Sequence, residues 1–564
     1  MKKNYLLLIF FVCFINLIQA QISSGGTPFS FGSHFREKNA NAIAPKTIVL
    51  ASPSLEKLIE DDQKYNYSRF AAPIAVNFNM ENSGTWTNLF NGDRIWRLKM
   101  KAEGAWCLRP LFDNFDLPKG GKMFIYNEEK TIIMGAFTDI SHSNKMLGTE
   151  IIEGNNLTIE YYEPKEVKNL AKISLFRVDY GYRRKPAEKQ NRLKMGGNTG
   201  FGDSGSCNIN VNCALGADWQ DQKKGVVKIN LTSINGSDWC TGSMINNTAL
   251  DRKAYLLSAD HCLNGQAQAF VNTWVFIFNY ESSGCANGSE PSKSQSISGA
   301  TVRASRSASD MLLLELSSVV PVSYNTYYNG WSREIGEAAT SVGIHHPRGD
   351  IKKISKSNVS SLRTNINYAN LDPTTPNSAG THFQIFWDAT NGITEPSSSG
   401  SPIFDPNKRI IGQLHGGASA CGASANNLWD VYGRVYSSWT GGGTISTRLS
   451  DWLDPTNTGV FTLNGLSAVL PSSIENTDVS NNIKVYPNPA TDFIYIETEK
   501  NADLGKNINI NIFSNEGKNI EEYTMNLENN ENKLKIKINS LPKGTYYFRF
   551  DTKKGVGIKK IVIE

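Results

Sequence analysis

Three segments in the middle of the chain each place a polar residue at the end of an apolar run. The run 255–259 leads to His261, and Asp310 opens the run 311–316. Ser399 lies in a tight loop of serine and glycine residues that precedes a further apolar pair. Short apolar runs separated by turn residues are typical of β-strands. The pattern therefore restricts this part of the chain to a β-fold in which several strand ends carry polar groups.

These residue types are the ones that nucleophilic catalysis by serine requires. A serine hydroxyl becomes reactive when an imidazole accepts its proton, and a buried carboxylate fixes the tautomer of the imidazole and stabilises its charged form. The order His261, Asp310, Ser399, with gaps of 49 and 89 residues, is that of the chymotrypsin-type triad. Taken singly, they could be a core histidine, a turn aspartate and an ordinary loop serine. Together they favour catalysis.

The surrounding segments carry a resemblance to a known family. SADHC, SDMLLLEL and SSSGSPIF resemble the signature segments of trypsin-like serine proteases. WCTGSMINN, FWDATNGITEPSSSGSP, GQLHGG and YGRVYSSWTGGGTISTRLSDWLD narrow the resemblance to bacterial lysyl endopeptidases, over residues 204–466. It implies catalytic roles for His261, Asp310 and Ser399, with the backbone N–H groups of Ser397 and Ser399 as the oxyanion hole. The family usually has glycine where Ser397 stands.

The resemblance also implies how the substrate is selected. Trypsin carries an aspartate six residues before its serine, but that position here is Ile393. Asp430 falls where the lysyl endopeptidase motif carries its pocket acid, and a compact acidic slot favours the lysine ammonium over the wider arginine fork. We expect Trp387 to shield the site from water and His415 to lie near His261. The alternatives are a turn acid for Asp430 and core positions for Trp387 and His415.

Six cysteines lie in the same region. The predicted signal peptide at 1–20, described below, implies export, and export favours oxidation of these cysteines. Spacing alone allows fifteen pairings. The short loop makes Cys240–Cys262 the easiest pair to justify, and the resemblance implies Cys207–Cys421 and Cys213–Cys285 for the rest. A zinc site is the competing interpretation; it is disfavoured because this region has no C-x-x-C pair. We expect no metal and no other cofactor.

We expect a mostly β protein whose catalytic domain is a chymotrypsin-like double β-barrel. Turn-bounded apolar runs predict strands in the catalytic domain at 226–231, 274–280, 311–316, 383–387, 409–415 and 431–436. A helix is expected only near the end of this domain, over residues 445–453. In the preceding region, alternating patterns predict strands at 95–100, 122–126 and 157–162.

The full chain of 564 residues is too long for one core. Residues 1–20 are predicted to be a signal peptide, since a basic start precedes a short apolar run. Cys13 as a lipidation site is the alternative, but the apolar run continues past it. We predict a β-rich pro-region at 21–194, a protease domain at 195–468 and a linker at 469–482. Lys194–Met195 is the preferred processing bond, and a permanent binding domain is the alternative to a pro-region.

The last region, 483–564, is predicted to be a small β-sandwich. Its segments YPNPATD and LPKGTYYFRF resemble the C-terminal sorting domain of the type IX secretion system. This implies the type IX secretion machinery as a partner and a product that is secreted, either free or attached to the cell surface. A carbohydrate-binding or adhesive module is the alternative.

Charge and composition exclude several other classes of function. The net charge of +5 is small for this length, so neither nucleic acid nor a membrane surface is implied as a partner. Beyond the leader, no segment is apolar enough to cross a bilayer. We expect a monomeric serine endopeptidase that acts on proteins and peptides after lysine. A mixed Lys/Arg preference and an inactive surface adhesin on a protease scaffold are the alternatives.

Overall fold

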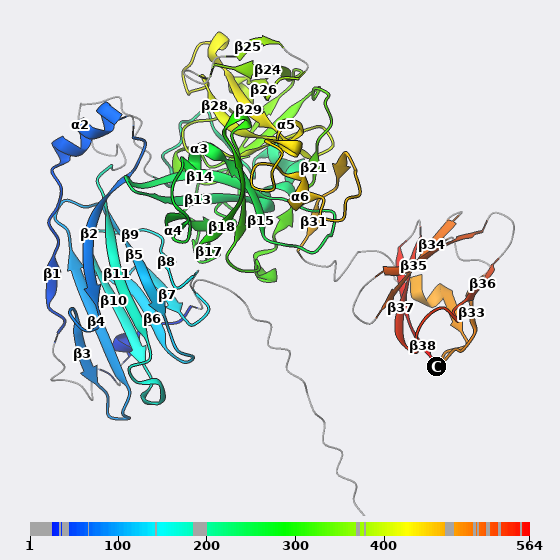
Figure 1. Ribbon diagram of the computed structural model, residues 1–564, viewed down its shortest axis with the longest axis horizontal. Helices are drawn as coiled ribbons and strands as arrows, with labels where there is room; N and C mark the ends of the chain where they lie inside the picture. Colours follow the sequence, from blue (N-terminus) through cyan, green and yellow to red (C-terminus); the bar gives the residue numbers. More distant parts are fainter. Residues whose placement is uncertain are drawn as a thin grey trace, which may run out of the picture. The chain divides into compact units, whose positions relative to one another are not determined.

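The computed structural model describes residues 25–32, 35, 44–65, 67–141, 144–183, 200–367, 371, 373–376, 379–468, 479–499, 504, 507–514, 519–527, 532–552 and 555–564. The predicted signal peptide and the Lys194–Met195 bond lie outside these residues. The chain divides into two compact units, Met1–Ala468 and Val469–Glu564. The expected mostly β fold is confirmed (Figure 1).

The N-terminal part of the first unit consists of two antiparallel-rich sheets that enclose one large apolar core. The strands predicted from alternation at 95–100, 122–126 and 157–162 all form, and they lie side by side as neighbours in the first sheet. The first sheet contains β1 (Thr47–Val49), β3 (Thr85–Asn88), β4 (Arg94–Lys101), β10 (Asn156–Glu163), β6 (Lys122–Asn127) and β7 (Ile133–Phe137). The second contains β2 (Ala71–Asn79), β11 (Lys172–Gly181), β5 (Cys107–Asp116), β8 (Leu147–Gly148) and β9 (Ile152–Glu153), and helix α2 (Leu55–Tyr65) precedes it.

The first barrel, formed by strands within residues 226–316, wraps around its own apolar core. Its strand β19 shows why the sequence MLLLEL is apolar almost throughout: Leu312 and Leu314 enter this core, whereas Met311 and Leu313 face a second core shared with the other barrel. Strands buried on both faces lose the usual alternation. The barrel contains β13 (Val226–Ser233), β14 (Gly236–Met244), β15 (Tyr255–Ala259), β16 (Val275–Ile277), β17 (Ser296–Ser298), β18 (Ala300–Arg306) and β19 (Met311–Leu316).

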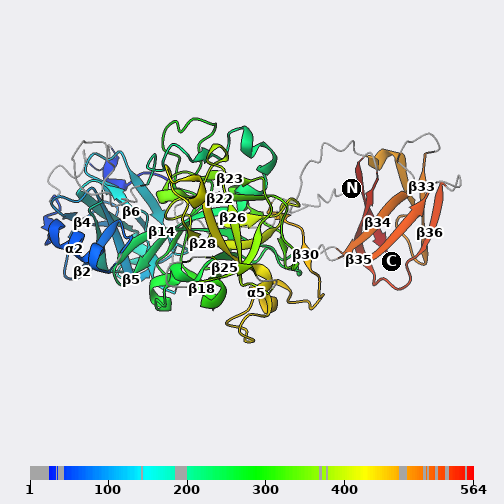
Figure 2. The same ribbon diagram turned by 90° about the horizontal axis from the view of Figure 1, so that it is seen from above.

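The second barrel, formed mainly by strands within residues 341–434, wraps around a core that includes Trp387, Ile393 and Tyr432. Strands β22, β23, β26 and β28 belong to the same sheet, and Figure 2 labels them close to one another. In hydrogen-bonding order the sheet runs β12 (Ile209–Asn210), β23 (Lys353–Ser357), β22 (Ser341–His345), β27 (Pro402–Phe404), β28 (Ile410–Gly417), β29 (Trp429–Arg434), β26 (His382–Phe386), β24 (Leu362–Ile366) and β25 (Pro373–Pro376).

The predictions of helices and strand ends in the two barrels are wrong in three respects. Helix was expected only over 445–453, but α3 (Asp260–Leu263) and α4 (Gln268–Val271) precede it in the chain. The strand expected over 431–436 ends at Arg434, and helix α5 (Val435–Thr440) follows directly because Val435 and Trp439 pack into the core between the barrels. Helix α6 is shorter than expected and spans only Ser450–Leu453. Residues before it form turns instead, and the carbonyl of Ser446 accepts a bond from Ser305 on β18.

The N-terminal part and the first barrel share a continuous sheet. Strand β2 pairs with β14 through Ala71 and Ser237. The fully buried Arg109 on β5 donates to barrel acceptors, namely Thr232 Oγ1 at 2.8 Å, Ser237 Oγ at 2.7 Å and the Thr273 carbonyl at 2.9 Å. Separating a buried guanidinium from several hydrogen-bond partners costs free energy. These bonds therefore stabilise the packing of the N-terminal part against the first barrel.

The second unit is a two-sheet sandwich around its own apolar core. One sheet contains β32 (Ile483–Tyr486), β33 (Phe493–Thr498) and β36 (Lys533–Lys537). The other contains β35 (Asn519–Asn526), β34 (Asn507–Ser514), β37 (Gly544–Asp551) and β38 (Val556–Ile563).

Candidate active site

The pairing of β15 with β19 brings His261 and Asp310 together. The two strands are antiparallel, with Ala259 opposite Met311, so the end of one lies beside the start of the other. His261 follows on the short helix α3 (Asp260–Leu263), and Asp310 precedes β19 with a left-handed backbone (φ 50°). Asp310 accepts the His261 backbone N–H at 2.9 Å and its Nδ1 at 2.8 Å. Both carboxylate oxygens are therefore used to orient His261.

The electrostatics of this pair favour an imidazole that takes up a proton. Asp310 is 2% exposed, whereas the His261 side chain is 40% exposed. Burial lowers the pKa of His261, but the charge of Asp310 and its hydrogen bond outweigh that effect and raise the pKa above its ordinary value of 6.5. With Nδ1–H donated to the carboxylate, Nε2 is the atom left to act as a base.

The loop that carries Ser399 comes from the second barrel and lies against β14, β15 and α3 of the first. The Thr241 N–H on β14 donates to the Ser399 carbonyl at 2.8 Å, and the Cys262 Sγ lies 3.9 Å from that carbonyl. Gly400 has φ +81°, and a Cβ there would lie 2.2 Å from the hydroxyl of Ser258. Among the described residues, no hydrogen bond joins the Ser399 hydroxyl to His261. Such bonds often shorten only when substrate binds.

The predicted oxyanion loop has the backbone that a glycine would favour. Ser397 has φ +71°, in the left-handed region where a non-glycine residue costs roughly 1–2 kcal/mol. This gives a physical reason for the glycine that the family usually has there. Within the described part of the chain, the N–H groups of Ser397 and Ser399 donate to no protein acceptor. The N–H of the intervening Ser398 is instead taken by the Glu395 carbonyl at 3.1 Å.

Asp430 lies on β29, close to the serine loop, and is 2% exposed. Its carboxylate accepts the Thr394 hydroxyl at 2.7 Å, the Ser419 hydroxyl at 2.7 Å and the indole N–H of Trp387. Burial raises its pKa, and these three hydrogen bonds partly offset the rise. All three donors are neutral, and no described cation pairs with Asp430. Trp387 therefore orients the carboxylate of Asp430. This hydrogen bond was not predicted from the sequence, from which Trp387 was expected to shield the site from water.

His415 lies beside His261, with ring centroids 5.6 Å apart and planes 19° apart. Its Nε2 is 3.9 Å from Asp310 Oδ2, and its Nδ1 is 3.0 Å from Nε2 of His382. Burial lowers the pKa of His415 and brings that of His382 to about 3, so burial favours the neutral form of both rings. One proton arrangement satisfies the contacts: Thr381 O–H donates to His382, His382 to His415, and His415 Nε2–H faces Asp310.

His382 was missed by the sequence reasoning, although it immediately precedes the strand predicted over 383–387. Its partner His415 is 33 residues away, and only the pairing of β26 with β29 and of β29 with β28 brings the two together.

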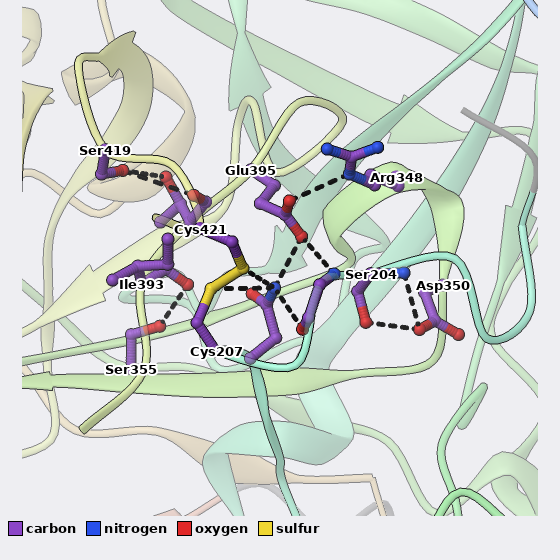
Figure 3. Close-up of a disulfide and its surroundings, with 12 residues drawn as sticks. Ser204, Cys207, Arg348, Asp350, Ser355, Ile393, Glu395, Ser419 and Cys421 are labelled. Atoms are coloured by element: carbon purple, nitrogen blue, oxygen red, sulfur yellow. Dashed lines mark hydrogen bonds and ion pairs between the residues drawn. A yellow bond between two sulfur atoms is a disulfide. The ribbon is translucent and has the colours of Figure 1, made fainter. Parts of the chain in front are cut away.

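The three disulfides found are the three pairs proposed in the sequence analysis. Cys240–Cys262 fixes β14 to α3 beside His261. Cys213–Cys285 connects segments 72 residues apart, and Cys207–Cys421 connects segments 214 residues apart. Figure 3 shows the last of these between the N-terminal segment of the domain and the loop that carries Ser419.

Among the residues that the structure describes, two side-chain groups have the composition of a metal site. Cys240 and Cys262, grouped with His261, are joined in a disulfide and offer no thiolate. His261, Asp310 and His415 also place one ligand atom each within 4.8 Å of one another. In that group Nδ1 of His261 is hydrogen-bonded to Asp310, an arrangement that serves proton transfer.

Comparisons with known proteins agree with this geometry. Residues 201–433 match the family described as "Lysyl endopeptidase, C-terminal domain", and residues 484–564 match "Secretion system C-terminal sorting domain". A curated relative, lysyl endopeptidase of Pseudomonas aeruginosa, is 29% identical over 371 residues, which cover 62% of this chain and 76% of the relative. Both resemblances drawn from the sequence are therefore confirmed.

The chain is a serine endopeptidase.

Solved structures also match the endopeptidase in part. The serine endoprotease of Yersinia pestis is 12% identical, covering 62% of this chain and 97% of that one, with a TM-score of 0.26. Protease Anisep of Arthrobacter nicotinovorans is 16% identical, covering 40% of this chain and 93% of that one, with a TM-score of 0.26.

The sorting domain places the endopeptidase outside the cell or at its surface. Among the described residues, no helix combines the length and the apolar character needed to cross a bilayer.

Proposed function

We propose that this endopeptidase hydrolyses peptide bonds on the carboxyl side of lysine. The observation that carries the proposal is the buried carboxylate of Asp430, which has three neutral donors and no described cation partner. A buried charge without a counter-ion is unfavourable, and a substrate ammonium would supply the missing charge. A side chain without that charge would leave Asp430 uncompensated, which costs several kcal/mol.

The reaction would proceed through an acyl-enzyme on Ser399. Nε2 of His261 takes the Ser399 proton as the oxygen attacks the carbonyl carbon, and then gives that proton to the leaving amine. Asp310 holds the imidazole in the required tautomer and stabilises its charged form. The N–H groups of Ser397 and Ser399 would hold the oxyanion, and a water activated by His261 would then release the acid product and free Ser399.

The experiment is a digest of an unfolded protein of mixed sequence, with every product terminus identified by mass spectrometry. The proposal predicts new C-termini that are almost all lysine. Comparable numbers of lysine and arginine termini would instead support the mixed preference. Asp430→Asn should remove the preference while leaving reaction with an active-site serine reagent intact, because Asp430 lies outside the triad.

We also propose the domain organisation on which this activity depends: a signal peptide at 1–20, a pro-region at 21–194, the protease at 195–468, a linker at 469–482 and the sorting domain at 483–564. The docking of Arg109 into the first barrel supports a role of the pro-region in folding the protease. Size-exclusion chromatography and intact mass of the secreted form would test it, since a permanent binding domain would remain covalently attached.

A further inference from the structure

Glu395 is a buried acid in the serine loop that has no role in the mechanism above. It lies four residues before Ser399, and its side chain is 1% exposed. A buried carboxylate requires charged or hydrogen-bonded partners. These partners come from two segments that are distant in the sequence.

The first partner is Arg348, whose Nε lies 2.9 Å from Oε1 of Glu395. The backbone N–H of Arg348 also donates to the carbonyl of Pro396 at 2.6 Å. One residue of the 347–349 turn therefore holds both the side chain of Glu395 and the backbone that follows it.

The second set of partners lies in the segment 202–208, at the start of the catalytic region. Oε2 of Glu395 accepts the Gly205 N–H at 2.8 Å and the Asn208 side-chain amide at 2.6 Å. Figure 3 shows this carboxylate between Arg348 and the segment that carries Ser204 and Cys207. The backbone of Gly205 packs closely against the Cys207–Cys421 disulfide, since a Cβ on Gly205 would lie 2.2 Å from the sulfur of Cys421.

The same segment is fixed a second time by a buried acid. Asp350 is fully buried and accepts the Gly202 N–H at 2.6 Å and the Ser204 hydroxyl at 2.5 Å. Lys353 lies 3.6 Å from this carboxylate. Residues 202–208 are therefore held at both ends, by Asp350 and by Glu395.

The backbone of Glu395 transmits this placement to the oxyanion loop. Its carbonyl accepts the Ser398 N–H at 3.1 Å and closes the turn in which Ser397 takes its left-handed conformation. The two N–H groups assigned to the oxyanion flank Ser398. A shift in Glu395 would turn these N–H groups away from the oxyanion.

We propose that Glu395 is a positioning residue for the oxyanion loop, and that residues 202–208 act on catalysis through it. The inference rests on the proposed function, because it assumes that Ser397 and Ser399 supply the oxyanion donors. One consequence concerns processing. The cut that releases the pro-region must fall before Gly202, because a later cut would remove donors from Asp350.

The test compares Glu395→Gln with Glu337→Gln in the full-length gene, using a lysyl peptide p-nitroanilide as substrate. Glu337 is the matched control, since it also pairs with an arginine in the same domain but is 37% exposed. We expect Glu395→Gln to lower kcat about 100-fold with KM changed less than two-fold, as for the loss of one oxyanion donor. The control should match wild type. A kcat for folded Glu395→Gln within two-fold of the control would overturn the proposal.

A second variant covers the case in which Glu395→Gln does not fold. Asn208→Ala removes one donor and leaves the acid in place, so we expect kcat to fall about 10-fold at unchanged KM. A purely structural role would change the melting temperature but leave kcat per folded molecule unchanged, and that outcome would also overturn the proposal. If wild type and Glu337→Gln both fail to cleave the substrate, the proposed function itself is wrong.

Discussion

The indole N–H of Trp387, the residue that follows β26, donates to Oδ2 of Asp430 on the neighbouring strand β29. This bond gives Asp430 a third neutral donor, beside Thr394 and Ser419. Trp387 therefore fixes the carboxylate without neutralising its charge, which leaves that charge available to the substrate cation that we propose.

Replacement of Trp387 by phenylalanine keeps most of the ring volume but removes this donor. One hydrogen bond to a charged group contributes about 1.5–3 kcal/mol, so we expect kcat/KM for a lysyl substrate to fall roughly 10- to 100-fold. The rate of reaction with a small serine reagent, which does not enter the pocket, should stay near that of wild type. If both rates fell together, Trp387 would be acting on the triad instead of on Asp430.

The pH dependence of kcat/KM follows from the His261–Asp310 pair. Only neutral His261 accepts the serine proton, so activity is lost as pH falls through the pKa of His261. Because Asp310 raises that pKa above 6.5, the acid limb should lie above pH 6.5. Asp310→Asn removes the charge and should move the limb to lower pH while lowering kcat about 10⁴-fold. A pH–rate profile whose limb does not move would exclude this role for Asp310.

His382 is expected to support the site through His415. His382→Leu removes the donor to Nδ1 of His415, and the loss of one neutral hydrogen bond of about 1 kcal/mol predicts a roughly five-fold fall in kcat/KM. His382→Gln retains an N–H donor and should recover most of the activity. Steady-state kinetics on the two variants at pH 8 provide the test, and equal activity of both would show that the His382–His415 bond has no catalytic effect.

The Cys240–Cys262 disulfide should stabilise the region around His261. The two cysteines are 22 residues apart in the sequence, and closing a loop of this size contributes about 3 kcal/mol. The double variant Cys240→Ala/Cys262→Ala is therefore expected to lower the free energy of unfolding by about this amount in urea titrations. The matched removal of Cys213–Cys285 should leave kcat per folded molecule closer to wild type, since that pair does not adjoin His261.

Much of the arrangement could be predicted from local sequence. His261 and Asp310 each adjoin a strand whose apolar run is complete in itself, and the pairing of those strands places the two residues together. The left-handed backbone of Ser397 could also be anticipated, because Ser397 stands where the family usually has glycine.

The remaining contacts could not be predicted, because their partners meet only in the folded chain. Two of the donors to Glu395 lie 187 and 190 residues away, and four of the hydrogen bonds of Arg109 go to acceptors in the first barrel. The strand predicted through Tyr436 ended early for a similar reason: Val435 and Trp439 find apolar surface between the two barrels, which local propensity does not describe.

The central claim is that Ser399, activated by His261, is the nucleophile. The most direct measurement is labelling of the secreted enzyme with a fluorophosphonate, followed by peptide mapping of the adduct. The account predicts one adduct per molecule, on Ser399, which is absent in Ser399→Ala and slowed at least 10³-fold in His261→Ala. An adduct on another serine, or labelling of the Ser399→Ala variant at the wild-type rate, would contradict it.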